Sequence, residues 1–329
     1  MQPVEYRLPA EWEPQTALLL AWPFPGSDWE PVLESIQAEY KALIQAALES
    51  QSVILLIQPG SEHARRQLGE HPSLKFVEAP YNDTWCRDFG PITLVRAGRR
   101  LAMDFYFDGW GGRREAKLDN RVNTQLARHE LFSNFDFRQS LFELEGGAVE
   151  CDGAGTLLIN RHCLRARHPY LEDAEVDYEL KSLLNASRLL EIDMPPMPGD
   201  DTDGHIDTLA RFADRDTIVF QMLADNARTR QLNGQLELLK TTQGQSYRLV
   251  ALPRAADLDP GLAASYVNFV LLNDAVLVPA FGSGADEQAR EALAALFPDR
   301  SVKLVDAKTL VSQGGGPHCA SMQIPAALG

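Results

Sequence analysis

The sequence predicts an α/β fold built from repeated modules of about 60 residues. Short apolar strands, each preceded by a turn, recur along the chain, and their first aliphatic residues are Leu101, Leu157, Ile218 and Val276. Those residues are separated by 56, 61 and 58 positions, and helical patterns lie between them. Alternating strands and helices at a fixed spacing are typical of repeated α/β modules. Five such modules fill 329 residues, which we expect to form a single domain, residues 1–329.

The helical patterns have the 3.6-residue spacing of amphipathic helices. The first begins at Glu30, and the apolar positions on its stripe are Leu33, Ile36, Tyr40, Leu43, Ile44 and Ala47. Similar stretches begin near Ala116, Leu171, Ala224 and Asp286. Periodicity alone leaves one alternative open, an ordinary α/β sheet whose strand spacing is coincidental.

Four polar clusters fall at one phase of this repeat. They are NDTWCRDFGP at 82–91, FELEGGAVE at 142–150, GDDTDGHID at 199–207 and SQGGGPHC at 312–319. Asp88 and Glu145 are 57 residues apart, and His205 follows Glu145 by 60. Cys319 follows His205 by 114 residues, which is twice 57. Because equivalent positions in a ring of modules converge on its axis, we expect these residues to meet at one central site.

The residue types in these clusters indicate nucleophilic chemistry on a cation. Three glycines let the backbone before Cys319 approach a ligand closely, and a cysteine thiolate is a strong nucleophile. His205 lies among several aspartates, which favour its charged form. A guanidinium suits this set, because carboxylates can grip its N–H edges while the thiolate attacks its central carbon. A proteolytic Cys-His site would need oxyanion donors rather than an acidic cluster.

Ordinary structural explanations compete at several of these positions. A turn or helix-cap role is sufficient to explain Asp83 and Asp203. Trp85 and Trp110 fit either the core or the wall of a pocket for a flat cation. We expect that His318 is not the base, because neighbours on an extended chain point to opposite faces.

The remaining cysteines form no metal or redox motif. None of Cys86, Cys151, Cys163 and Cys319 belongs to a CxxC pair, and we expect Cys151 and Cys163 to be inert core thiols. Cys86 is ambiguous, because it is flanked by a candidate site.

Composition excludes several classes of partner. The net charge of −15 argues against binding to nucleic acid, and suits either a cationic small molecule or solubility alone. The longest apolar run, 266–281, is interrupted by Asn268, Asn273 and Asp274, so we expect no membrane span. The first residues, MQPVEYRLPAEWEP, lack the apolar region of a signal peptide. A cytoplasmic protein with reduced thiols is the expectation.

Motifs in all four clusters carry a family resemblance. They are W-x-R-D-x-G-P at 85–91, L-E-G-G at 144–147, D-G-H-I-D at 203–207 and G-x-x-H-C with an M-Q-x-P tail at 315–325. F-D-G-W-G-G at 107–112 and N-F-V-L-L-N-D-A-V-L-V-P at 268–279 add to them. From about residue 9 to 325 the chain resembles the agmatine deiminases, of the Porphyromonas-type peptidylarginine deiminase family in the guanidine-modifying pentein superfamily. The resemblance implies a five-bladed α/β propeller of ββαβ-type modules around a central site, a homodimer, and no metal or organic cofactor.

The resemblance also implies a role for each motif residue. Cys319 would attack the guanidinium carbon. His205 would protonate the departing ammonia and then activate the water that hydrolyses the covalent amidino-cysteine adduct. Asp88 and Asp207 would hold the guanidinium nitrogens, and Glu145 would orient His205 and the substrate.

The implied reaction is hydrolysis of agmatine to N-carbamoylputrescine and ammonia, a step towards putrescine. Asp201 matches a position that recognises the far end of the substrate, where an acidic side chain suits the ammonium of agmatine and repels the carboxylate of arginine. Trp85 and Trp110 would line the pocket. The chain departs from the family pattern at Gly316-Pro317, where proline removes an amide donor. The alternatives are deimination of free or peptidyl arginine, amidino transfer to an amine, and a non-catalytic binding module of this fold.

Overall fold

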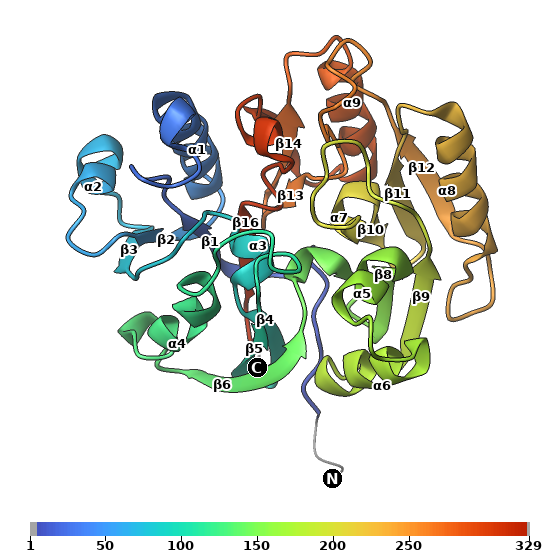
Figure 1. The fold of residues 1–329 in the computed structure, drawn as a ribbon, viewed down its shortest axis with the longest axis horizontal. Coiled ribbons are helices and arrows are strands. Elements are labelled where there is room, and N and C mark those ends of the chain that lie inside the picture. Colours follow the sequence, from blue (N-terminus) through green and yellow to red (C-terminus); the bar gives the residue numbers. More distant parts are fainter. Residues whose placement is uncertain (1–4, 328–329) are drawn as a thin grey trace.

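Five small sheets surround a common centre in the computed structural model, which describes residues 5–327 (Figure 1). One sheet in that range has four strands, and each of the others has three. The repeated modules expected from the sequence period are therefore confirmed, as is the propeller implied by the resemblance. The four strands predicted from their first aliphatic residues are the middle strands of four different sheets.

Four of the modules follow the same ββαβ plan. Two antiparallel strands are followed by a helical crossover, and the third strand then pairs parallel to the second. The first of these modules holds β4 (Ile92–Arg96), β5 (Arg99–Tyr106), α4 (Val122–Leu126) and β6 (Phe135–Glu143). The second holds β7 (Val149–Cys151), β8 (Thr156–Asn160), α5 (Arg161–Arg167), α6 (Asp173–Leu183) and β9 (Arg188–Ile192). The third holds β10 (Ala210–Asp214), β11 (Thr217–Gln221), α8 (Asn226–Leu238) and β12 (Arg248–Leu252). The fourth holds β13 (Val270–Leu271), β14 (Ala275–Ala280), α9 (Asp286–Leu296) and β15 (Ser301–Asp306).

The remaining module is assembled from both ends of the chain. Its early elements are β1 (Gln15–Ala21), α1 (Leu33–Leu48), β2 (Ser52–Ile57), α2 (His63–Leu68) and β3 (Leu74–Glu78). The antiparallel partner of β1 is the last strand, β16 (Ser321–Pro325), in which Pro325 lies opposite Gln15. The ring of modules is therefore closed by a strand that comes directly after the Cys319 loop.

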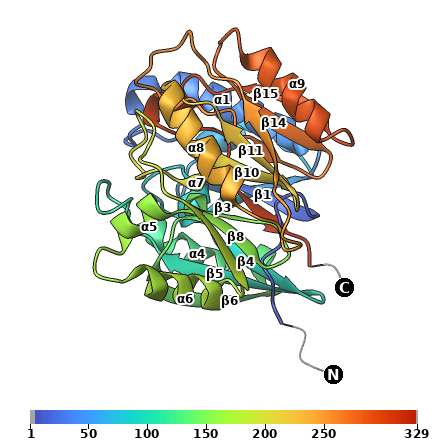
Figure 2. The same cartoon turned by 90° about the vertical axis from the view of Figure 1, so that its right-hand side faces the viewer.

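Burial of apolar residues explains why each crossover helix packs on its sheet. On α1 the expected stripe is confirmed, since Ile36, Tyr40, Leu43 and Ile44 are buried. Figure 2 shows α8 lying across β10 and β11 on the outer side of that module. The middle strands are almost continuously apolar, as expected for strands covered on both faces. No helix within residues 5–327 is both long and apolar enough to cross a membrane.

A short turn ahead of the first strand of each module directs side chains to the centre. These turns are α3 (Cys86–Phe89) before β4, η4 (Gly146–Ala148) before β7, α7 (Ile206–Leu209) before β10, the 265–268 turn before β13 and the 317–320 turn before β16. Figure 1 shows α3 and α7 near the middle of the ring. Residues spaced about 60 apart in sequence therefore meet in space.

Candidate active site

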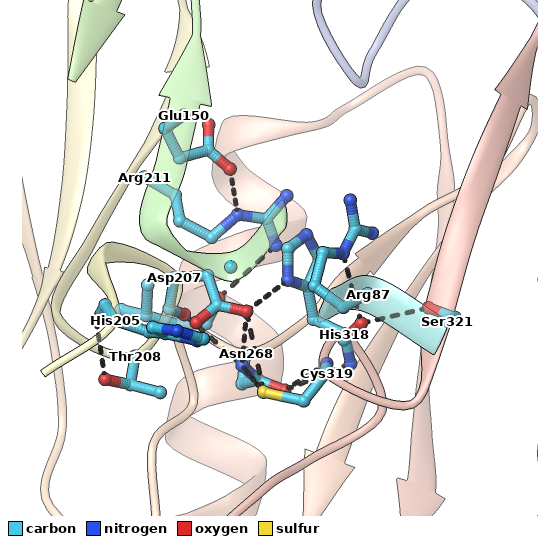
Figure 3. A network of polar contacts seen from close by, with 12 residues as sticks. Arg87, Glu150, His205, Asp207, Thr208, Arg211, Asn268, His318, Cys319 and Ser321 are labelled. Carbon is cyan, nitrogen blue, oxygen red and sulfur yellow. Dashed lines mark hydrogen bonds and ion pairs between the residues drawn. The ribbon is translucent and has the colours of Figure 1, made fainter. Parts of the chain in front are cut away.

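Cys319 lies in the 317–320 turn, and its side chain is buried. Its sulfur accepts a hydrogen bond from Asn268 Nδ2 at 3.0 Å and lies 3.5 Å from Asp207 Oδ2 (Figure 3). The glycines before it are required for close packing. A Cβ at Gly315 would lie 2.3 Å from the Trp85 ring, and one at Gly316 would lie 2.7 Å from Asn268 Oδ1.

Asn268 fixes the loop that carries the thiol. Its Oδ1 accepts hydrogen bonds from the backbone amides of His318 (3.0 Å) and Cys319 (3.1 Å). Its Nδ2 lies within reach of both Asp207 Oδ2, at 3.3 Å, and the Cys319 sulfur. One amide side chain therefore holds the nucleophile by its backbone and by its sulfur.

His205 lies between two of the predicted carboxylates, and all three side chains are buried. Its Nδ1 is 3.6 Å from Asp88 Oδ1, and its Nε2 is 3.9 Å from Glu145 Oε2. The absence of a side chain at Gly147 allows this approach, because a Cβ there would lie 2.5 Å from His205 Nδ1. Asp88 is held by the Gly147 amide at 3.1 Å and by Trp110 Nε1 at 3.0 Å.

Several buried polar atoms of the site have no hydrogen-bond partner within residues 5–327. They are Glu145 Oε2, Asp207 Oδ1, and both ring nitrogens of His205. Buried polar atoms are normally paired, and those that are not call for an explanation. Acceptors on two carboxylates suit a ligand that donates several N–H groups.

The charge state of the His205 group follows from its surroundings. Burial disfavours the imidazolium, but Asp88, Cys163 and Glu145 outweigh it and hold the pKa of His205 well above its usual range. Burial also raises the pKa of Glu145, yet His205 and Arg167 lower it to about 2. Arg167 Nε donates a hydrogen bond to Glu145 Oε1. The site thus holds a protonated histidine beside an ionised glutamate.

The nucleophile is kept neutral in the free site. Burial, followed by the charges of Asp207 and Asp88, raises the pKa of the Cys319 thiol well above its usual range. Burial also raises the pKa of Asp88 to about 6, although His205 acts in the opposite direction. A cation bound between the two aspartates would favour the thiolate.

A pocket opens from this centre to the surface. Its lining residues are Asp28, Asp83, Trp85, Asp88, Trp110, Arg114, Asp201, Thr202, Thr208, Gln313, Gly314, Gly315 and Cys319. Asp201 and Arg114 form an ion pair at 3.4 Å, and Arg114 also contacts Asp28 at 2.9 Å. Burial raises the pKa of Asp83 to about 6, although the Thr84 amide donates a hydrogen bond to it. Aromatic walls and a mostly acidic mouth are the surroundings that a long cation needs.

The structure brings the eight predicted residues together in and around this pocket. Those that line it are Trp85, Asp88, Trp110, Asp201 and Cys319. Buried near them are Glu145, His205 and Asp207.

Sequence reasoning missed Asn268 and Arg167. His205 and Cys319 are separated by two repeats, so one module between them contributes no predicted site residue. The expected position in that module, residue 262, lies six positions before Asn268, and this gap could have pointed to Asn268. Arg167 belongs to no motif that marks it. Asp203 is more than a turn residue, since both Arg113 and Arg167 pair with it at 2.6 Å.

The expectation that His318 and Cys319 face opposite ways is wrong. Residues 317–320 form a turn rather than an extended segment, and both side chains reach Asp207 Oδ2. Both ring nitrogens of His318 are occupied, one by Asp207 and one by Glu11.

Cys163 lies closer to the site than an inert core thiol would. Cys163, Glu145 and His205 each present one potential metal donor, and the three atoms lie within 4.8 Å of one another. Arg167 pairs with Glu145, and the surrounding groups hold His205 as a cation, which suits these residues to acid–base work.

Comparison with known proteins places the chain in a family. The model of the Porphyromonas-type peptidyl-arginine deiminase family matches residues 7–325. An agmatine deiminase of Pseudomonas putida is 28% identical over 98% of this chain and 96% of its own. A variant of C. jejuni agmatine deiminase, solved with substrate bound, is 30% identical with a TM-score of 0.90, and the match covers 100% of this chain and 99% of that one. A Porphyromonas gingivalis chain provisionally described as an arginine deiminase is 38% identical with a TM-score of 0.90, and 98% of each chain is covered. The protein belongs to the Porphyromonas-type peptidyl-arginine deiminase family.

Proposed function

We propose that this protein hydrolyses agmatine to N-carbamoylputrescine and ammonia. The observation that carries the proposal is the convergence of the Cys319 thiol and the His205 imidazolium with three buried carboxylates on one pocket. Carboxylate oxygens without partners match the N–H groups of a guanidinium. The names of the P. putida and C. jejuni relatives support the same substrate.

Binding of the guanidinium activates the nucleophile. Its nitrogens donate to Asp88 and Asp207, and its positive charge offsets the two charges that oppose ionisation of Cys319. Asn268 Nδ2 then donates to the thiolate. The thiol proton leaves to solvent, and the reactive thiolate is formed only when substrate is present.

Two proton transfers at His205 complete the reaction. The thiolate sulfur bonds to the guanidinium carbon, and His205 gives its proton to the departing amino group, which leaves as ammonia. The neutral imidazole then removes a proton from water, whose oxygen attacks the amidino-cysteine carbon. The hydroxyl proton of the resulting adduct is lost to solvent as the carbon–sulfur bond breaks, which releases the neutral ureido product and the Cys319 thiolate. Glu145 holds the imidazolium form of His205 through charge. Every step uses side chains of this chain and requires no metal or organic cofactor.

The mouth of the pocket favours a substrate with a second positive charge. Asp28, Asp83 and Asp201 outnumber the single cation Arg114 there. The ammonium of agmatine can replace Arg114 beside Asp201, whereas the carboxylate of arginine would meet repulsion.

Arginine is the second candidate substrate, and two observations favour it. Arg114 lies at the mouth and could pair with a carboxylate, and the P. gingivalis relative carries an arginine deiminase description. Asp201 and Arg114 therefore decide the choice between agmatine and arginine.

Ammonia release by the purified protein tests both candidates. Agmatine, free arginine and a blocked arginyl peptide are compared, with Cys319→Ala as the inactive control. We expect release from agmatine that is absent in the variant. Release chiefly from arginine would keep the mechanism and reject the substrate. Release from none of the three would contradict the deiminase function.

The homodimer, the cytoplasmic location and the single-domain organisation of residues 1–329 remain predictions. Light scattering of the purified protein measures the first. Cell fractionation measures the second. Limited proteolysis followed by mass spectrometry tests the third, since a single domain should yield no stable half-length fragment.

A further inference from the structure

His318 contributes its ring to a buried cluster of charges on the side of Asp207 away from His205 (Figure 3). The members of this cluster, called the His318 cluster, are Glu11, Arg87, Glu150, Asp207, Arg211 and His318, and all of them are buried. None of these residues except Asp207 has a role in the proposed reaction. Buried charges are costly to maintain, so the cluster calls for an explanation.

The ring of His318 bridges two carboxylates. Its Nδ1 is 2.7 Å from Asp207 Oδ2, and its Nε2 is 2.8 Å from Glu11 Oε2. An ionised carboxylate only accepts hydrogen bonds, so two such contacts require a hydrogen on each ring nitrogen. The ring is then a cation.

The composition of the cluster supports the same charge. Arg211 lies 2.6 Å from both Glu11 and Glu150, and Arg87 lies 3.8 Å from Glu11. Three carboxylates face two guanidinium groups, and a charged His318 ring adds a third positive charge between Glu11 and Asp207. Burial raises the pKa of Glu150, whereas the pKa values of Glu11 and Asp207 are lowered, so the charge of His318 lies beside the two carboxylates that are held ionised.

His318 determines which oxygen of Asp207 is left for a ligand. Oδ2 receives His318, and it also lies close to Asn268 Nδ2 and to the Cys319 sulfur. Oδ1 is buried and has no partner within residues 5–327. Because His318 directly precedes Cys319 in the chain, the same contact sets the nucleophile at a fixed place relative to this carboxylate.

We propose that His318 is a positioning residue, a buried cation that aims Asp207 Oδ1 at the guanidinium and links that carboxylate to the Cys319 loop. Glu11, which pairs with Arg211, holds the far side of the ring. The kinetic consequences of this inference rest on the proposed deiminase function. The direction of the pKa shift of Asp207 is consistent with a charged His318. Burial raises this pKa, but His318, followed by His205 and Arg87, lowers it below its usual range.

Two amide substitutions separate the two contacts of the ring. In His318→Asn the amide nitrogen can occupy the place of Nδ1 and still donate to Asp207. In His318→Gln it can occupy the place of Nε2 and donate to Glu11 instead. We expect kcat/KM for agmatine to fall roughly 10- to 100-fold more in His318→Gln than in His318→Asn. His71→Gln, at an exposed histidine, serves as the matched control.

The pH profile distinguishes a positioning role from a structural one. The groups facing Asp207 are Arg87, Asp88, Asp200, His205, Arg211, His318 and Cys319. Loss of the His318 charge raises the pKa of Asp207, so the acid limb of kcat/KM moves to higher pH in His318→Gln. The limb also becomes steeper, because Asp207 and Asp88 then both take up a proton in the same pH range. An acid limb identical to that of the wild type would overturn the proposal.

A second measurement needs no turnover. Nitrogen-15 spectra of histidine-labelled Cys319→Ser protein, with the signals assigned by His318→Asn, report the protonation of each ring. The proposal predicts that His318 has two N–H groups at pH 7, whether or not agmatine proves to be the substrate. A neutral His318 ring would overturn it. Failure of the wild type to release ammonia from agmatine would instead reject the proposed function.

Discussion

Replacing Asn268 by aspartate removes the hydrogen bond from Nδ2 to the proposed nucleophile, together with the contact of Nδ2 with Asp207. The aspartate retains an oxygen for the backbone amides of His318 and Cys319, so the loop keeps its support. It replaces Nδ2, which donates to the Cys319 sulfur at 3.0 Å, by a second oxygen that cannot donate. The substitution therefore acts on the Cys319 sulfur and on Asp207, while the loop keeps its amide acceptor.

The expected loss can be worked out from that contact. A hydrogen bond to a charged group contributes about 1.5–3 kcal/mol. Since each 1.36 kcal/mol changes a rate about tenfold, kcat for agmatine should fall roughly 10- to 150-fold. Repulsion between the new carboxylate, Asp207 and the thiolate adds to this loss, so the figure is a lower bound.

Steady-state kinetics and alkylation together measure the effect. The rate at which iodoacetamide modifies Cys319, with Cys319→Ser as background, follows the thiolate fraction and should fall with kcat. Asn226→Asp makes the same change at an exposed position and should have no effect on either rate. A kcat of Asn268→Asp within twofold of the wild type would refute the assignment of Nδ2 as a thiolate donor.

Three further changes probe the carboxylate and histidine group. Because Asp88 has a pKa of about 6, its protonation below that pH removes the guanidinium clamp, and kcat/KM should fall there. In Asp88→Asn this limb should vanish and KM should rise; a wild-type profile that stays flat to pH 5 would contradict the reasoning. Arg167→Met removes the buried guanidinium that pairs with both Glu145 and Asp203 and should reduce the free energy of unfolding by about 3–5 kcal/mol in urea denaturation, whereas a loss below about 1 kcal/mol would count against these pairs. Gly147→Ala places a Cβ 2.5 Å from His205 Nδ1 and 2.9 Å from Asp88 Oδ1, so these side chains must shift and kcat should drop about 100-fold.

The repeat of strands and helices was predictable because local patterns of apolar residues determine it. Strand starts such as Leu157 and Ile218, and the stripe that includes Tyr40, depend on neighbours within a few residues. Their spacing then placed Asp88, Glu145 and Cys319 at one phase, and the structure brings those side chains to one centre.

The partners of those residues were not predictable in the same way. Arg167 reaches Glu145 from the helix α5, and Glu11 reaches His318 across 307 positions. Such pairs form because a buried charge requires a counter-charge, and which charges are buried together depends on how the modules pack. The spacing of residues in the sequence does not contain this information. The backbone of 317–320 was misjudged for a related reason, since the turn is stabilised by the distant side chain of Asn268.

The closing strand β16 has a consequence for how the protein reaches its active form. Its pairing with β1 joins Gln15 to Pro325, one of the longest sequence separations in the molecule. Contacts that close so long a loop carry a large entropic cost and tend to form late in folding. Because the turn with Cys319 leads directly into β16, the thiol reaches the carboxylates only when this pairing forms. Recovery of turnover after dilution from denaturant should therefore lag behind recovery of helical signal, making catalysis a reporter of the last event in folding.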